Sequence, residues 1–380
     1  MTSILSKEFR IKPSEIGFCG IKDKRAISFQ FITIPIKSID LIEKIKNFKH
    51  SRISIYPIKY VSKKISTLDL LYNSFNVIIR KTKFLLDNAF SITNQIINEI
   101  KGSGILNYYG YQRFGVKRPI NHMIGKYLLK NDFEKTIKYF LAAYSKIEEN
   151  DAFEARKMLS NTWNYEEAFN IFPKRLIYER RLLSSLIKEE NYIKCFRALP
   201  LRLRKLFIQS YSSLIFNKAI SKICEYDIDT FKIMNGDLVL MLNQYHKPIG
   251  KILKARAYNL NLLMNYISKG RAIIVLPVLG YKIKMPENIK GQIIREIMRE
   301  EGINEKDFII KKMPEISFPG SYRTLRIKNF EIFSEKKFDK NEEVIKVSMK
   351  LPSGVFAIMV LRDIMKNSNP LTYYGLQENF

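Results

Sequence analysis

The chain has 380 residues, with 65 Lys and Arg against 37 Asp and Glu, so its formal net charge is +28 and its pI is near 9.8. This excess predicts a strong positive field and a polyanionic partner, with nucleic acid as the first candidate and an anionic membrane surface as the alternative. The longest uninterrupted apolar run is Val355–Leu361. It is far shorter than the ~20 residues needed to span a bilayer, which excludes a transmembrane helix.

The N-terminus reaches Lys7 and Arg10 without an apolar stretch, so it predicts neither a secretory signal nor a lipid-attachment motif. We therefore expect a cytoplasmic protein that does not bind membranes. The three cysteines, Cys19, Cys195 and Cys224, lie far apart, and the three histidines show no ligand spacing with them. This spacing is typical of free thiols and ordinary polar histidines, and no metal site is expected.

Strand and helix alternate through the first hundred residues. Aromatic and β-branched residues predict strands over 28–36, 53–60 and 74–81. Between them, Ser38 can cap a helix over 38–47, and apolar residues at helical spacing predict a second helix over 85–100, stopped by two glycines.

The character of the chain changes beyond residue 104. Residues 121–223 are almost entirely helical in period, with charged faces. Strand character returns over 271–284, an amphipathic helix follows over 288–302, and a strand over 344–351 leads into an apolar helix over 355–366.

The charged stretch 334–343, SEKKFDKNEE, is predicted to be an exposed loop. Both ends of the chain combine strands with helices, whereas the middle is rich in helix. This arrangement predicts one α+β domain interrupted by an insertion.

One carboxylate in the segment GIKDKRA has a setting that suits chemistry. Asp23 lies between Lys22 and the pair Lys24 and Arg25, and neighbouring cations stabilise the ionised carboxylate that a nucleophile or proton acceptor requires. On spacing alone, a solvated structural turn is the commoner explanation of such a segment.

Three further segments carry candidate side chains. NYYGYQRFG, Asn107–Gly115, combines aromatic faces that can stack on bases with an arginine and glycine turns that can hold phosphate, although a packed aromatic corner explains it equally well. Asn73 and Phe75 fall on the same side of a strand start. The helical segment from Ile208, IQSYSSLIFNKAIS, is best explained by core packing.

Segments spread along the chain resemble, in order, the characteristic segments of TruD-type pseudouridine synthases. The resemblance runs from about Ile4 to Lys366, and GIKDKRA combined with NYYGYQRFG is specific where neither is alone. The segments are GIKDKRAISFQ, LYNSFNVIIR, NYYGYQRFG, IQSYSSLIFN, LPVLGY, FPGSYRTL and LPSGVFAIMVLRDIMK.

The resemblance implies an α+β pseudouridine-synthase catalytic domain with a mixed sheet, interrupted by a helix-rich TruD-specific insertion domain. We expect the catalytic domain to comprise residues 1–104 and 323–380, and the TruD-specific insertion to comprise residues 105–322.

By the same resemblance, Asp23 is the catalytic aspartate and Asn73 helps to position it. Lys22 lies beside the aspartate, and Phe75 stacks on the target base. The aspartate can act by attacking C1′ of the ribose or by removing a proton from C2′, and the sequence does not choose between these routes. No cofactor is implied.

The implied activity is isomerisation of uridine to pseudouridine in tRNA, at uridine 13 of the D-arm, with other structured RNA as a further substrate class. We expect a monomer. The candidate phosphate contacts are Arg113, Arg202, Arg204 and Lys205.

The chain departs from the family pattern in three places. It begins only about twenty residues before GIKDKRA, where family members have several dozen, so part of the catalytic sheet is expected to be missing. Tyr72 stands where Gly is common, and Asp363 stands where Glu is usual. The alternative function is therefore a catalytically silent RNA-binding protein or tRNA chaperone, with a basic membrane-surface protein a distant third.

Overall fold

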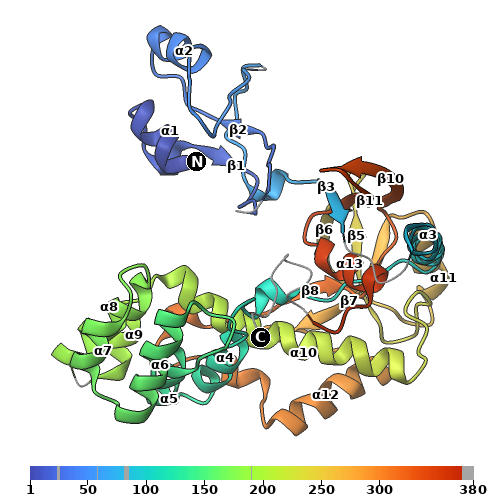
Figure 1. Ribbon diagram of the computed structural model, residues 1–380. Helices are drawn as coiled ribbons and strands as arrows, with labels where there is room; N and C mark the ends of the chain where they lie inside the picture. The colour runs from blue at the N-terminus through green and yellow to red at the C-terminus, as the bar shows by residue number, and fades with distance from the viewer. Residues whose placement is uncertain (24–25, 58, 81–84, 190, 370–380) are drawn as a thin grey trace. The chain divides into compact units, whose positions relative to one another are not determined.

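The structure is a computed structural model that describes residues 1–23, 26–57, 59–80, 85–189 and 191–369. The chain divides into two compact units, Met1–Asn73 and Ser74–Phe380. Each unit is built around its own hydrophobic clusters, and their elements are labelled in Figure 1.

The first unit is small and has short elements. Its core packs Leu5, Phe9 and Leu41 together, and β1 pairs antiparallel with β2. Its elements are α1 Thr2–Glu8, η1 Pro13–Glu15, β1 Gly17–Phe18, β2 Ile32–Thr33, α2 Ile39–Lys46 and η2 Thr67–Asp69.

The helix predicted over 38–47 is present as α2, with Ser38 as its N-cap residue. The strand predicted over 28–36 is reduced to the two residues of β2. Over 53–60, none of the residues that the structure describes lies in a strand. A strand forms only where a neighbouring backbone completes its hydrogen bonds, and β1 offers β2 only two partners.

The second unit contains a three-stranded sheet in the order β10-β11-β3. Helices α3 and α13 pack with it around a core that includes Ile97, Val347 and Val360. The elements are β3 Tyr72–Ile79, which begins at the end of the first unit, α3 Leu86–Ser103, β10 Glu331–Asp339, β11 Glu342–Pro352 and α13 Ala357–Met365.

The prediction of a loop over 334–343 was wrong, because this stretch forms the end of β10, a turn and the start of β11. The turn is made by Lys340 and Asn341, both with positive φ. Cross-strand charge pairs occupy the exposed face, such as Lys346 with Glu335 at 2.7 Å. A hairpin whose exposed face carries charged residues has the composition of a loop, and the sequence does not show that its two strands pair.

The helices of residues 121–225 form a module around a large hydrophobic core. Helices α4 and α10 lie close together because Gly125 has no side chain: a Cβ there would come within 2.2 Å of the carbonyl oxygen of Phe207. The helices are α4 Asn121–Leu129, α5 Phe133–Ala142, α6 Asn150–Thr162, α7 Tyr165–Ile171, α8 Ile177–Lys188, α9 Tyr192–Arg197 and α10 Leu201–Glu225.

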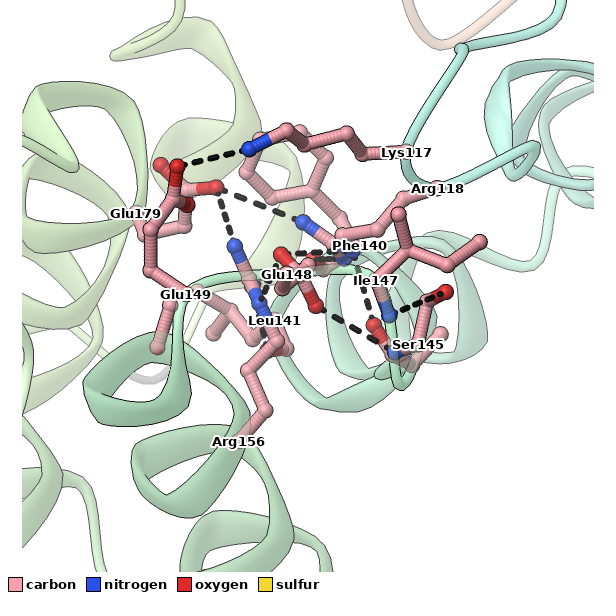
Figure 2. A network of polar contacts seen from close by, with 12 residues as sticks. Lys117, Arg118, Phe140, Leu141, Ser145, Ile147, Glu148, Glu149, Arg156 and Glu179 are labelled. Atoms are coloured by element: carbon pink, nitrogen blue, oxygen red, sulfur yellow. Dashed lines mark hydrogen bonds and ion pairs between the residues drawn. The ribbon is translucent and has the colours of Figure 1, made fainter. Parts of the chain in front are cut away.

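The interior of this module contains two arginines and two glutamates (Figure 2). Arg156 of α6 donates to Glu179 of α8 at 2.7 Å, to Glu148 at 3.2 Å and to the carbonyl of Leu141 at 2.8 Å. Arg118 lies against the same two carboxylates. Burial, together with the nearby charge of Arg156, lowers the pKa of Arg118 to about 10. The network balances its own charge and joins three helices.

A second sheet, antiparallel and in the order β6-β5-β7-β8, packs through β7 against α10. Helix α11 covers β7 as well, and α12 packs on α10. The elements are β5 Leu238–Leu242, β6 Pro248–Lys254, α11 Leu260–Ser268, β7 Ala272–Val278, α12 Ile289–Glu301 and β8 Ser321–Thr324, with the 3-10 turns η4 Glu305–Phe308 and η5 Pro314–Ile316 between α12 and β8.

The last residue of α12 closes an ionic cluster between helices. The Glu301 carboxylate accepts hydrogen bonds from Lys126 of α4 at 2.6 Å and from the Tyr211 hydroxyl of α10 at 2.8 Å, and it pairs with Lys218. Burial raises the pKa of Glu301, but these hydrogen bonds outweigh it and lower the pKa to about 2.

The architecture is α+β, as the sequence predicted, with antiparallel pairing between β10 and β11 and throughout the second sheet, and with a helix-rich middle. The later predicted elements are present as β3, α3, β7, α12, β11 and α13. No helix in the described part of the chain is long and apolar enough to cross a membrane.

Candidate active site

The segment that carries the candidate carboxylate follows β1 through a bend at Cys19 and Gly20. Gly20 has a φ of 105°, a conformation that favours glycine, and the chain then presents Lys22 and the exposed Asp23. Lys22 Nζ donates a 2.7 Å hydrogen bond to Oδ1 of Asn73, which lies 51 residues later. The residue before Asp23 is thereby tied to the start of β3. Lys24 and Arg25 lie outside the described residues.

Strand β3 carries the two other predicted site residues. Phe75, Val77 and Ile79 share one face of the strand and pack on the core of the three-stranded sheet, and the alternation of a strand puts Asn73 on the same face. Asn73 ends the first unit and Phe75 belongs to the second. Phe75 is partly buried, so one side of its ring is supported by the protein.

The backbone of the segment Asn107–Gly115 is held by hydrogen bonds to side chains of α10. Tyr109 exchanges two backbone hydrogen bonds with the side chain of Asn217, at 2.8 and 3.0 Å. The Ser210 hydroxyl donates to the carbonyl of Arg113 at 2.7 Å. Ser210 and Asn217 both lie on α10, within the segment that the sequence assigned to packing. That helix therefore holds the backbone of the aromatic segment as well as filling the core.

Arg113 is partly buried at the end of this segment. Its Nε donates to Ser213 at 3.0 Å, and its guanidinium lies 5.3 Å from the centre of the Tyr109 ring. Burial lowers the pKa of Arg113, while the Tyr109 hydroxyl opposes this shift. Its hydrogen-bond partners, Ser213 and Gln209, are neutral, so they do not offset its positive charge.

The three basic candidates at the start of α10 have different surroundings. Arg202 and Lys205 are exposed. Arg204 is buried, and it donates to the carbonyl of Leu199 at 3.0 Å and to Glu315 at 2.8 Å. A role of Arg204 in holding the start of α10 fits these contacts better than a phosphate contact does.

Arg323 on β8 has a role that the sequence reasoning missed. It donates through Nε to the carbonyl of Asn107 at 2.9 Å and through NH2 to the carbonyl of Gly354 at 2.9 Å. Its guanidinium lies 4.2 Å from the centre of the Tyr109 ring. Burial lowers the pKa of Arg323 to about 10. Arg323 thus joins the aromatic segment to the turn before α13. The segment FPGSYRTL contained it, but no local pattern indicates these distant partners.

The described residues contain no group of three or more His, Cys, Asp or Glu side chains that could hold a metal ion. In the first unit, the polar groups next to Asp23 in the chain are the Lys22 ammonium and the Asn73 amide that it contacts. In the second unit, two arginines, Arg113 and Arg323, lie on the aromatic segment. These groups can orient a carboxylate and contact an anion.

Comparison with known proteins agrees with the fold and the segments. The profile of the family described as "tRNA pseudouridine synthase D (TruD)" matches residues 1–364. The chain belongs to the TruD family. TruD proteins are pseudouridine synthases, which are isomerases.

Individual TruD proteins support this assignment over nearly the whole chain. A curated "Probable tRNA pseudouridine synthase D" from Thermococcus sibiricus is 34% identical over 367 residues, covering 96% of this chain and 85% of that protein. One from Pyrococcus abyssi is 32% identical over 372 residues, covering 96% and 86%. The crystal structure of a TruD protein from Methanosarcina mazei superimposes with a TM-score of 0.81 at 28% identity, covering 97% of this chain and 85% of that one.

Proposed function

We propose that this TruD family member converts uridine to pseudouridine in tRNA, at uridine 13 of the D-arm, with Asp23 as the catalytic aspartate. The observation that carries the proposal is the hydrogen bond between Lys22 and Asn73, because it ties the residue next to Asp23 to a second candidate site residue in a chain that matches the family over residues 1–364.

The reaction is an isomerisation in which the bond between N1 of uracil and C1′ breaks, the base turns, and C5 bonds to C1′. C5 then loses its proton and N1 gains one, so no atoms are added and no oxidant or cofactor is required. In one route Asp23 attacks C1′ as uracil leaves, and C5 of the turned base then displaces the carboxylate. In the other, Asp23 removes the C2′ proton as uracil leaves, and this proton returns to C2′ when C5 bonds to C1′. Both routes need a carboxylate held beside the sugar. The hydrogen bond between Lys22 and Asn73 can fix the position of the chain next to Asp23.

Phe75 is proposed to stack on the target base. An enzyme that reacts at C1′ within folded RNA must turn the nucleotide out of its stack, at a cost of a few kcal/mol that an aromatic face partly offsets. The ring of Phe75 suits this role, since the sheet core supports it and it remains partly exposed.

The RNA backbone is proposed to contact Arg113, Arg202 and Lys205. Arg113 is pre-oriented by Ser213, and the other two are exposed near the start of α10. Arg204 acts with them only indirectly, by fixing the start of that helix. The net charge of +28 suits tRNA as the partner, in the cytoplasm where such an RNA is modified.

We also propose that residues 105–322 form the TruD-specific insertion within a catalytic domain of residues 1–104 and 323–380. Two strands at the expected junctions support this division. β4 Ile105–Leu106 pairs antiparallel with β9 Arg326–Ile327, so the chain leaves and returns at neighbouring positions. An insertion requires such close ends.

The test is tritium release from a tRNA transcript labelled at uracil C5, with wild type, Asp23→Asn and Asp40→Asn compared. Asp40 is an exposed aspartate of the same unit, in the first turn of α2, so its variant removes the same charge from a different element. We expect release by wild type and by Asp40→Asn, none by Asp23→Asn, and tRNA affinity within about twofold for all three, because one charge of many is lost.

Position 13 is tested with a transcript that carries cytidine there, which should release no tritium. Release by Asp23→Asn at the wild-type rate would remove Asp23 from the mechanism. Absence of release by the wild type, with tRNA binding intact, would favour a catalytically silent RNA-binding protein.

A further inference from the structure

One stretch of the second unit carries only positive charge. Residues 238–286 contain eight Lys and Arg and no Asp or Glu. The stretch forms β5, β6, α11 and β7, and Glu287, immediately after it, pairs with Lys254 and Arg256. The remaining cations of this stretch are Lys247, Lys251, Lys269, Arg271, Lys282 and Lys284.

Two turns of this stretch meet at one end of the second sheet. One is the β5–β6 turn, 243–247, and the other is the α11–β7 turn, 269–271. The backbone of Leu242 donates to the carbonyl of Arg271 at 2.8 Å, and a Cβ at Gly270 would lie 3.7 Å from the His246 ring. These contacts place side chains from both turns on a common surface.

The side chains at this end are exposed and of two kinds. Tyr245 is 59% exposed and Tyr266, in the last turn of α11, is 37% exposed. Lys269 and Arg271 are exposed beside them. The backbone of Arg271 donates to the carbonyl of Tyr266 at 2.8 Å, and its Nε donates to the carbonyl of Leu242, the last residue of β5, at 3.4 Å. We call these four residues the basic tyrosine surface.

The neighbouring edge of the sheet extends this surface. Among the described residues, β6 pairs only with β5, so it is an edge strand of the second sheet. Along it, Ile249, Lys251 and Leu253 are exposed. The edge therefore offers apolar side chains and one more cation.

We propose that the basic tyrosine surface binds unpaired nucleotides of the RNA substrate, through residues other than those of the candidate active site. Exposed aromatic rings stack on any base whose face is free, and lysine or arginine beside them neutralise the adjoining phosphates. A duplex offers phosphates but hides its base faces, so the tyrosines specify an unpaired segment. Charge complementarity also selects RNA over a protein partner, since the stretch lacks any carboxylate of its own. The inference rests on the proposed function for its RNA partner.

The test is direct binding of an unmodified tRNA transcript across a salt series. Lys269→Ala combined with Arg271→Ala should weaken binding about three- to tenfold near 0.15 M salt and make the slope of log K against log salt shallower by about 1.5, since each phosphate contact contributes ~0.7–0.9. The matched control is Lys311→Ala combined with Lys312→Ala, two exposed lysines outside the stretch. Equal weakening by the control pair would mean that net charge alone matters and would overturn the proposal.

A second pair of variants tests the stacking. Tyr245→Ala should weaken tRNA binding about fivefold or more, whereas Tyr245→Phe, which keeps the ring, should bind as wild type does. Neither change should affect binding to a blunt RNA duplex. No loss of tRNA affinity in Tyr245→Ala and in the Lys269/Arg271 pair would overturn the proposal and assign the surface to another partner, such as a protein strand added to β6.

These measurements are independent of turnover. Loss of tRNA affinity in the surface variants supports the surface even if Asp23→Asn remains active. Unchanged affinity overturns the surface even if Asp23→Asn is inactive. The fluorescence of Trp163, the single tryptophan, and circular dichroism report whether each variant is folded.

Discussion

Replacing Arg156 with methionine should destabilise the helical module more than any surface charge change. The guanidinium is 1% exposed and donates to two glutamates and two carbonyls, those of Phe140 and Leu141 (Figure 2). Methionine fills much of the volume but leaves two buried carboxylates with one cation, Arg118.

The expected cost follows from that imbalance. Removing one partner of a buried ion pair costs about 3–5 kcal/mol, chiefly because an uncompensated charge remains. Arg118 lies 3.6 Å from Glu148 and 3.4 Å from Glu179 and compensates in part, so we expect about 3 kcal/mol. With a urea m-value of about 2–3 kcal/mol/M, the unfolding midpoint falls by about 1–1.5 M.

The assay is urea unfolding followed by tryptophan fluorescence. The single tryptophan, Trp163, follows α6 directly as its C-cap residue, so it reports on the helix that carries Arg156. The control is Arg175→Ala, which removes an exposed arginine paired with Asp151 on α6 and should change the midpoint far less.

The second arm combines Arg156→Met with Glu179→Gln. Because the double change removes one charge of each sign, it should cost less than the sum of the two single changes, by about 0.5–3 kcal/mol. Strict additivity, or an Arg156→Met midpoint equal to that of Arg175→Ala, would refute the reasoning.

Three other changes test separate contacts. Because the folded state lowers the pKa of Glu301, the interactions of its carboxylate stabilise the fold fully above pH 4.5, the pKa of the unfolded state, and are lost as the pH falls towards 2. At neutral pH, Glu301→Gln should lower the free energy of unfolding by about 1–2 kcal/mol after allowance for solvent screening. In urea titrations, this difference from wild type should shrink between pH 4.5 and pH 2. Gly110→Ala places a Cβ 2.8 Å from Ile358 and should lower the free energy of unfolding by about 1–3 kcal/mol in the same assay. The backbone φ of −77° suits alanine, so any loss reports on packing and not on backbone strain, and an unchanged midpoint would contradict tight packing here. Lys22→Met and Asn73→Ala should each lower the kcat of tritium release with little effect on tRNA affinity. The kcat of the double variant should be only slightly lower than that of either single variant, and fully multiplicative losses of kcat would mean that the two residues act separately.

The sequence predicted the elements whose evidence is local. A helix reveals itself by apolar residues every three or four positions, and α3, α12 and α13 all lie within two or three residues of their expected bounds. The family was also readable from GIKDKRA and NYYGYQRFG in combination, and the TruD profile matches residues 1–364. Sequence reasoning failed for the hairpin at 334–343, where charged side chains on a solvent face hid the pairing of the backbones.

Tertiary structure alone decided which distant residues meet. Lys22 and Asn73 are 51 positions apart, and Arg323 contacts Asn107, more than two hundred positions earlier. Likewise, Arg202 and Arg204 look alike in sequence, but one is exposed and the other is buried against Glu315. The physical reason is that residue type and spacing determine local periodicity, whereas burial and partners depend on how separate elements pack. The sequence by itself therefore determined the family, the candidate aspartate and most helices, and the packing decided which side chains hold the candidate site in place.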